Sequence, residues 1–157
     1  MITNRKVYES WKPVQYAKYE SMFQKIRDRI RKGSLFDYGI GPGWLEMFFD
    51  EKGVRFDRIV GFDPEPKMTE PKLANVEYVH SGPLEEEFDN VFCIDTAHLL
   101  KEPEEELPHL VRKGGLLVVS VPMRFMNKMP EFKSMRVLEK GIVGSAEKDF
   151  FWAWEKV

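Results

Sequence analysis

Asp37-Tyr38-Gly39-Ile40-Gly41-Pro42-Gly43 is the stretch of the sequence that decides the fold. A short apolar run from Ser34 leads into it, and good helix formers follow it from Trp44 to Phe49, so the segment predicts a strand, a tight turn and a helix. Glycine permits a sharp turn here and lets the backbone approach a ligand without a Cβ in the way. It also leaves the first N–H groups of the next helix free to meet an anionic group. Taken alone, the cluster is equally well interpreted as a tight turn without a ligand.

Asp63 is the second residue that points to a ligand. It ends a predicted strand at 58–62 and follows Gly43 by about 20 residues, where an acidic side chain can accept hydrogen bonds from ribose hydroxyls. Asp63 before Pro64 is also a common turn pair, so a purely structural role stays open. Gly43 comes one position earlier than in the dinucleotide fingerprint, and Trp44 stands where its last glycine would be. The indole would crowd a pyrophosphate, so the pattern favours an adenosine cofactor without one and disfavours a nicotinamide-dependent oxidoreductase.

The rest of the chain alternates between predicted strands and predicted helices. Helices are expected over 14–30, 44–49 and 103–112, and strands over 34–38, 58–62, 76–79, 91–94 and 116–121. This alternation predicts an α/β fold with a parallel sheet covered on both faces. The last strand-like segments, 135–138 and 150–154, are separated by only about ten residues, which favours a closing hairpin over another crossover helix.

The chain length fits one domain. Its 157 residues, 43% of them hydrophobic, suffice for a sizeable core. We expect a single domain over 1–157, with an N-terminal helical cap over 1–33, a cofactor-binding core over 34–122 and a C-terminal hairpin region over 123–157. Aromatic residues at 150–154 are expected in the core, although an exposed subset would indicate a homodimer face.

Charge and cysteine content limit the partners. With 24 Lys and Arg against 26 Asp and Glu, the net charge is −2, which disfavours nucleic acid. No apolar run is long enough to cross a bilayer, so no membrane partner is expected. Cys93 is the single cysteine, which excludes an internal disulfide and fits a cytoplasmic protein. His80 and His109 lack companions at metal-ligand spacing, so no metal is expected.

Four segments in order resemble the motifs of class I S-adenosylmethionine-dependent methyltransferases, particularly the small-molecule branch. These segments are Phe36–Gly43, Val60–Asp63, Phe88–Phe92 and Val111–Pro122. The resemblance implies a doubly wound, mostly parallel seven-stranded sheet with helices on both faces and an antiparallel last strand. It further implies that S-adenosylmethionine lies across the carboxyl ends of the first, second and fourth strands.

The resemblance also implies a set of cofactor-binding residues. Asp37 and the glycine loop, with Gly39, Gly41 and Gly43, would face the methionine and ribose portions. Asp63 would bind the ribose, and Phe62 or Pro64 would lie against the adenine. Cys93, Ile94 and Asp95 would lie near the sulfonium. An acid often follows the third strand in such enzymes, and here Ser81 or backbone groups would replace it.

Catalysis leaves few signals in such a sequence, because methyl transfer is an in-line displacement that depends mainly on orientation and exclusion of water. If the acceptor must lose a proton, Asp95 and His98 are the available bases. A helix cap is the alternative for Asp95, and a packed or surface position is the alternative for His98. The motif Asn-Pro-Pro-Tyr is absent after the fourth strand, which disfavours DNA-adenine methylation.

A further interpretation concerns one end of the site. The aromatic residues Tyr8, Trp11, Tyr16 and Tyr19 are candidates for a lid over the cofactor, with ordinary helix packing as the alternative.

The leading functional hypothesis is methyl transfer to a small-molecule acceptor. The alternative is a non-catalytic cofactor-binding module or partner subunit, which the short chain and the missing acid after the third strand favour.

Overall fold

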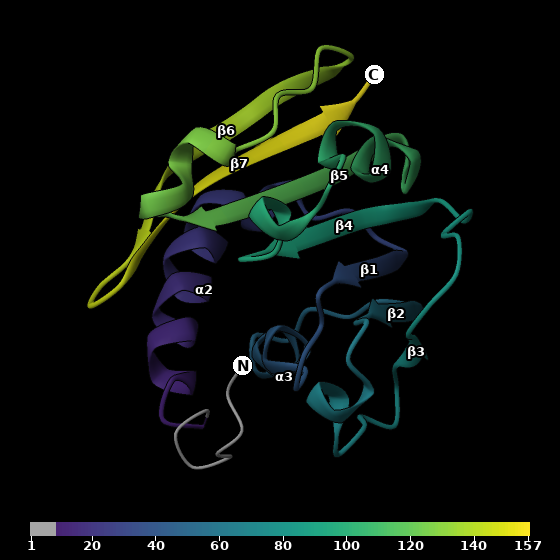
Figure 1. Cartoon of the computed structure of the whole chain (residues 1–157), viewed down its shortest axis with the longest axis vertical. Coiled ribbons are helices and arrows are strands. Elements are labelled where there is room, and N and C mark those ends of the chain that lie inside the picture. The colour runs from purple at the N-terminus through teal and green to yellow at the C-terminus, as the bar shows by residue number, and fades with distance from the viewer. Residues whose placement is uncertain (1–8) are drawn as a thin grey trace.

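The fold is built on one seven-stranded sheet (Figure 1). The computed structural model describes residues 9–157. The strands in chain order are β1 (Ser34–Tyr38), β2 (Arg58–Phe62), β3 (Glu77–Val79), β4 (Phe88–Ile94), β5 (Val111–Pro122), β6 (Met135–Gly144) and β7 (Lys148–Lys156). Their spatial order is β3-β2-β1-β4-β5-β7-β6. The first five strands pair in parallel, whereas β7 lies antiparallel to both β5 and β6. The predicted doubly wound, mostly parallel sheet with an antiparallel last strand is therefore confirmed.

Helices lie on both faces of this sheet. The α-helices are α2 (Lys12–Ile26), α3 (Trp44–Glu51) and α4 (Pro103–His109), and the 3-10 helices are η1 (Arg27–Arg29), η2 (Pro66–Thr69), η3 (Ala97–Leu99) and η4 (Met123–Lys128). Strand residues alternate between two hydrophobic clusters because successive side chains point to opposite faces. Leu35 and Phe92 pack with α2 and α3, whereas their neighbours Phe36 and Cys93 pack with α4.

Several elements differ in length from the sequence prediction. The helix α4 ends at His109 rather than at residue 112, because Val111 already pairs with Phe88 in the sheet. The strand β6 runs from Met135 to Gly144, far beyond the predicted 135–138. Its added residues lie on the edge of the sheet, where β7 supplies the hydrogen bonds and only one face needs to be apolar. The helix α2 ends at Ile26, and the predicted last turn is the 3-10 segment η1.

The chain changes direction across the sheet between β1 and β4. From β1 it continues outward through β2 to β3, and it then returns to place β4 and β5 on the opposite side of β1. The loops after β1 and β4 therefore diverge at the carboxyl edge of the sheet (Figure 1). Such a topological switch point is where open α/β sheets commonly bind their ligands.

Candidate cofactor site

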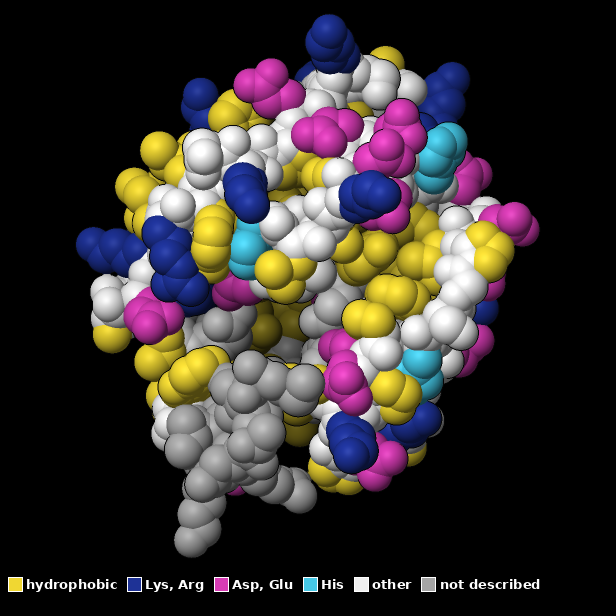
Figure 2. All heavy atoms as spheres, in the orientation of Figure 1, with side chains coloured by type: hydrophobic (Ala, Val, Ile, Leu, Met, Phe, Trp, Pro, Cys, Tyr) yellow, Lys and Arg dark blue, Asp and Glu magenta, His cyan; other side chains and the backbone are white. Residues whose placement is uncertain are grey.

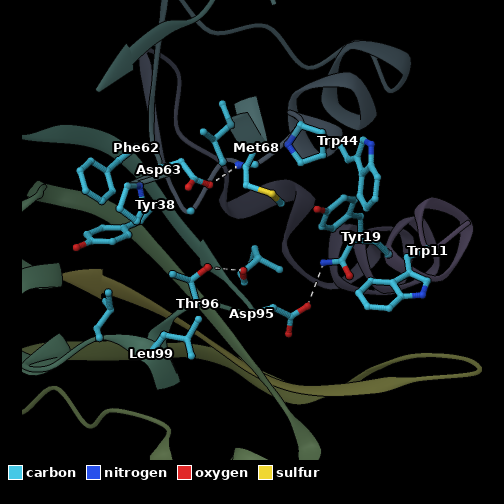
Figure 3. Close-up of a pocket in the computed structure, with 18 residues that line it drawn as sticks. Trp11, Tyr19, Tyr38, Trp44, Phe62, Asp63, Met68, Asp95, Thr96 and Leu99 are labelled. Atoms are coloured by element: carbon cyan, nitrogen blue, oxygen red, sulfur yellow. Dashed lines mark hydrogen bonds between the residues drawn. The ribbon is translucent and has the colours of Figure 1, made fainter. Parts of the chain in front are cut away.

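A cavity of about 560 Å³ lies at this switch point. Residues from α2, from the turns after β1, β2 and β4, and from the segments that follow them line it: Trp11, Gln15, Tyr19, Tyr38, Gly39, Ile40, Gly41, Pro42, Trp44, Phe62, Asp63, Pro64, Met68, Ile94, Asp95, Thr96, Leu99 and Leu100. Figure 2 shows the surface hollowed on this face, with hydrophobic side chains around the hollow. Figure 3 shows labelled side chains from several elements arranged around the same space.

The glycine turn is held against the ends of two neighbouring strands. The N–H groups of Gly39 and Ile40 both donate to the carbonyl oxygen of Phe62, at 2.7 and 3.0 Å. Gly39 has a φ of 90°, and a Cβ built on it would lie 2.3 Å from Oγ1 of Thr96. Only glycine allows both this left-handed backbone and this close approach to the exit of β4. The turn therefore forms a fixed floor of the cavity.

The Asp63 carboxylate is fixed by backbone donors from two loops. Its Oδ2 accepts a hydrogen bond from the N–H of Gly41 at 3.0 Å, which Figure 3 marks. Its Oδ1 accepts a hydrogen bond from the N–H of Glu65 at 2.9 Å. A carboxylate offers about four lone-pair positions, so about two remain for a ligand. Phe62 and Pro64 on either side of Asp63 line the same cavity. The structure thus brings together Gly39, Gly41, Phe62, Asp63 and Pro64 of the predicted cofactor residues.

Asp37 lies beneath the turn rather than on the cavity wall. Its side chain is buried beside Glu46 of α3, which is buried as well. Burial, together with the negative charge of Asp63, raises the pKa of Asp37 to about 6, against the lowering effect of the neighbouring Glu46 carboxyl group. Burial and the Asp37 charge also raise the pKa of Glu46 well above its usual value. Two carboxyl groups in such contact are most stable when they share a proton.

Asp95 lines the cavity at the exit of β4, in an unusual backbone conformation. Its φ is 55°, in the left-handed region that non-glycine residues seldom adopt. Its Oδ2 accepts from Nε2 of Gln15 at 3.1 Å, marked in Figure 3, and from Nζ of Lys18 at 3.3 Å. No side-chain hydrogen bond caps η3, and the Thr96 hydroxyl instead donates to the carbonyl of Ile94. The geometry therefore favours a role at the cavity over a helix cap for Asp95.

His98 is half-buried and is not among the residues that line the cavity. Its ring stacks on Phe125 with 4.6 Å between the ring centroids and 20° between the planes. Burial lowers the pKa of His98, and the nearby charges of Lys128 and Arg124 lower it further. The ring is packed against Phe125 and lies outside the lining of the cavity, which fits the packed alternative better than a base at the cavity.

Three other predicted cofactor residues do not line the cavity. Gly43 begins α3 with a φ of 81° and faces Leu73, Ser81 is exposed after β3, and Cys93 is buried on the α4 face of the sheet. Burial raises the pKa of the Cys93 thiol well above its usual value. These positions place the side chains of Ser81 and Cys93 away from the cavity.

The aromatic residues near the N-terminus separate into two groups. Trp11 and Tyr19 line the cavity, whereas Tyr16 packs edge-on against Phe48 of α3 with 5.7 Å between ring centroids. Tyr8 lies outside the described residues. The lining residues Gln15, Met68, Leu99 and Leu100 were not predicted from the sequence. For Gln15 the only available signal was its position one helical turn after Trp11 on the same helix.

A second cavity, of about 590 Å³, lies on the other side of Tyr38 and Phe62. The connection between β3 and β4 and the helix α4 line it, with carboxylates from Glu85, Glu87 and Glu106. This connection contributes no residue to the first cavity.

Over residues 9–157, no three His, Cys, Asp or Glu side chains are grouped so as to hold a metal ion. Within the same range no helix is long and apolar enough to cross a membrane.

Comparison with known proteins supports the fold assignment. No family model matches the sequence, and no curated protein matches it in sequence. A S-adenosylmethionine-dependent methyltransferase from Aquifex aeolicus is similar in structure over 100% of both chains, with a TM-score of 0.71 and 18% identity. Magnesium protoporphyrin IX methyltransferase (ChlM) from Synechocystis PCC 6803, solved with bound S-adenosylmethionine, is similar over 100% of this chain and 86% of its own, with a TM-score of 0.66 and 11% identity.

A third similar structure is a complex. It holds the Haloferax volcanii Trm112 methyltransferase activator and a methyltransferase that is similar over 99% of both chains, with a TM-score of 0.63 and 10% identity. At these identities the likeness establishes the fold. The chain therefore has the Rossmann-like fold of the class I S-adenosylmethionine-dependent methyltransferases, as the resemblance of its motifs implies.

Proposed function

We propose that this chain binds S-adenosylmethionine at the glycine turn and transfers its methyl group to a small-molecule acceptor. The observation that carries the proposal is the Asp63 carboxylate, which Gly41 and Glu65 orient at the cavity with acceptor positions to spare. Ribose hydroxyls are the donors that an acid at this position of the fold binds. Trp44 lines the cavity beside the turn, which fits an adenosine ligand without a pyrophosphate.

The lining residues fit the parts of this cofactor. Gly39 and Gly41 would face the methionine and ribose portions, with Asp37 acting from beneath the turn and Gly43 shaping it. Phe62, Pro64 and apolar residues of the β4 exit would lie along the adenine. Trp11 and Tyr19 would exclude water from the other end. We do not extend the proposal to the side chains of Ser81 and Cys93.

Asp95 is the residue best placed to act on the acceptor. The bound cofactor would supply an electrophilic methyl group on a sulfonium. For an N–H or O–H acceptor, the Asp95 carboxylate, which lines the cavity, would accept the proton that the acceptor loses on methylation. His98 would contribute only by packing against Phe125 next to this side of the cavity, and would not take the proton.

A small acceptor fits the described surface better than a polyanion. The net charge is −2, and the cavity mouth carries the exposed apolar side chains of Trp11 and Leu99. The similar ChlM structure is named as a methyltransferase of magnesium protoporphyrin IX, which is a small molecule. Apolar walls with few polar groups are typical of small-molecule sites.

A second candidate function is a non-catalytic cofactor-binding module or partner subunit. The connection between β3 and β4 offers no carboxylate to the first cavity, which would weaken adenine recognition. The similar methyltransferase from Haloferax volcanii is named as part of a complex with an activator. This candidate predicts weak cofactor binding and no turnover by the isolated chain.

Label transfer separates these functions. The protein is incubated with methyl-labelled S-adenosylmethionine and a cell extract divided by ultrafiltration into small metabolites and macromolecules. We expect label in the small-metabolite fraction, together with S-adenosylhomocysteine. Label confined to macromolecules would contradict the small-molecule acceptor. No transfer to either fraction would favour the non-catalytic candidate.

A further inference from the structure

A buried cluster of charged side chains lies behind Asp95. The Lys18 ammonium on α2 lies 3.3 Å from Oδ2 of Asp95 and 2.9 Å from Oδ1 of Asp149 on β7. The side chains of Lys18 and Asp149 are 5% and 0% exposed, against 23% for Asp95. One buried cation thus serves two carboxylates, and only the carboxylate of Asp95 reaches the cavity.

The backbone and polar neighbours hold this cluster together. The hydroxyl of Ser120 donates to Oδ2 of Asp149 at 3.0 Å, and the Ser120 carbonyl accepts from the N–H of Asp95 at 2.9 Å. Gln15 donates to the same Asp95 oxygen as Lys18, whereas Oδ1 of Asp95 is buried and receives no hydrogen bond from an N–H or hydroxyl donor among the described residues. The left-handed backbone of Asp95 is unfavourable for a residue with a side chain, and these contacts hold it so that its carboxylate stays at the cavity.

The charge balance makes one proton exchangeable. With both carboxylates ionised, Lys18 leaves a net charge of −1 in a buried site, which is costly unless a proton or another cation compensates it. Burial first, and then the hydrogen bond to Asp95 and its negative charge, raise the pKa of Asp149 to about 7, against the lowering effect of Lys18. Three further titratable groups interact with this cluster. The charge of Asp149 acts to raise the pKa of His98, and the charge of Asp95 acts to raise the pKa values of Tyr19 and Cys93.

We propose that Lys18, Asp95 and Asp149 form a charge-sensing site that releases its shared proton when a cationic ligand occupies the cavity and retains it for a neutral one. The inference rests on the proposed function, in which the donor carries a sulfonium and the product a neutral thioether. The site would therefore distinguish the two by charge. Lys18 and Asp149 act through Asp95 and are positioning residues.

Calorimetric titration tests the inference without knowledge of the acceptor. S-adenosylmethionine and S-adenosylhomocysteine are each titrated in two buffers of different ionisation enthalpy, which gives the number of protons released on binding. At pH 7 a group with a pKa near 7 is about half protonated, so we expect the cationic ligand to release up to about half a proton more than the neutral one. We also expect the affinity for the cationic ligand to fall by about tenfold from pH 7.5 to pH 5.5, whereas the affinity for the neutral ligand should not change in this way.

Variants assign the effect to the cluster. In Asp149→Asn the part of the difference that comes from the cluster should vanish, whereas any contribution from the amino groups of the ligands should be the same as in the wild-type protein. Asp50→Asn is the matched control on the exposed surface of α3 and should behave as wild type. In Lys18→Met the pH dependence of the affinity for S-adenosylmethionine should move to higher pH, because the carboxylates lose the cation that favours their ionised form. Thermal unfolding verifies that each variant is folded.

The outcomes separate this inference from the proposed function. Equal proton release by both ligands in the wild-type protein would overturn the inference alone, even if Asp149→Asn failed to fold. An unchanged difference in folded Asp149→Asn would overturn it as well. Absence of binding by either ligand would contradict the proposed function and the inference together.

Discussion

The backbone N–H of Gly41 donates a 3.0 Å hydrogen bond to the carboxylate of Asp63, so the glycine turn after β1 and the end of β2 are joined at the floor of one cavity. The bond has two effects. It holds the turn in its left-handed conformation, and it orients the acid that we propose as the ribose acceptor.

Replacement of Asp63 should weaken cofactor binding. We expect Asp63→Ala to reduce the affinity for S-adenosylmethionine by about 1–3 kcal/mol, the range for hydrogen bonds to a charged group. Equilibrium dialysis with labelled cofactor measures the change, with Asp50→Asn as a surface control. An affinity equal to that of the wild type would show that the ribose assignment is wrong.

Gly39 should be irreplaceable because of its surroundings as well as its backbone. Gly53 also has a positive φ, of 74°, but a Cβ there would meet no atom within 4 Å. Gly53→Ala should therefore cost only the left-handed backbone, about 1–2 kcal/mol in the free energy of unfolding. Gly39→Ala adds the collision with Thr96 and should cost about 1–3 kcal/mol more. Urea unfolding of both variants tests the comparison, and equal losses would contradict the close packing.

The buried pair of Asp37 and Glu46 should make stability depend on pH. Because the folded-state pKa of Asp37 is raised from 3.8 to about 6, the folded state binds more protons than the unfolded state between these values. Stability should therefore fall as the pH rises from about 4 to 6 and remain lower above that range.

Asp37→Asn removes this loss, since an amide carries no charge and can donate to Glu46. We expect a gain of roughly 2–3 kcal/mol in the free energy of unfolding at pH 7, with little change at pH 4. Unfolding by urea at several pH values measures it. A variant less stable than wild type at pH 7 would argue against the protonated pair.

The thiol of Cys93 should be inert in the folded protein. It is fully buried on the α4 face, and burial raises its pKa. Only the thiolate reacts readily, so a thiol reagent such as dithionitrobenzoate should react with the single cysteine only after denaturation. Rapid reaction under native conditions would place the thiol at an accessible surface.

The elements around the glycine turn could be predicted because their signals are local. The structure has β1 at Ser34–Tyr38 and β2 at Arg58–Phe62, as the apolar runs and the following turn residues predict. The length of β6 could not be predicted, because its second half pairs through backbone hydrogen bonds with β7 and carries no apolar pattern of its own.

The charged cluster could not be predicted for a similar reason. Lys18 in α2 has the pattern of a solvent-facing lysine, and Asp149 lies in a charged segment just before the strand predicted at 150–154. Their partnership depends on α2 packing across the sheet beside β7, a tertiary contact with no local signal. Asp95 was predictable only because it ends a strand that resembles a known motif.

Isothermal titration of the purified chain with S-adenosylmethionine, and in parallel with NAD, decides whether the cavity at the glycine turn is a methyl-donor site. The geometry of Gly41, Asp63 and Trp44 predicts micromolar binding of S-adenosylmethionine and no binding of NAD. Binding of NAD, or of neither ligand, would contradict the proposed function.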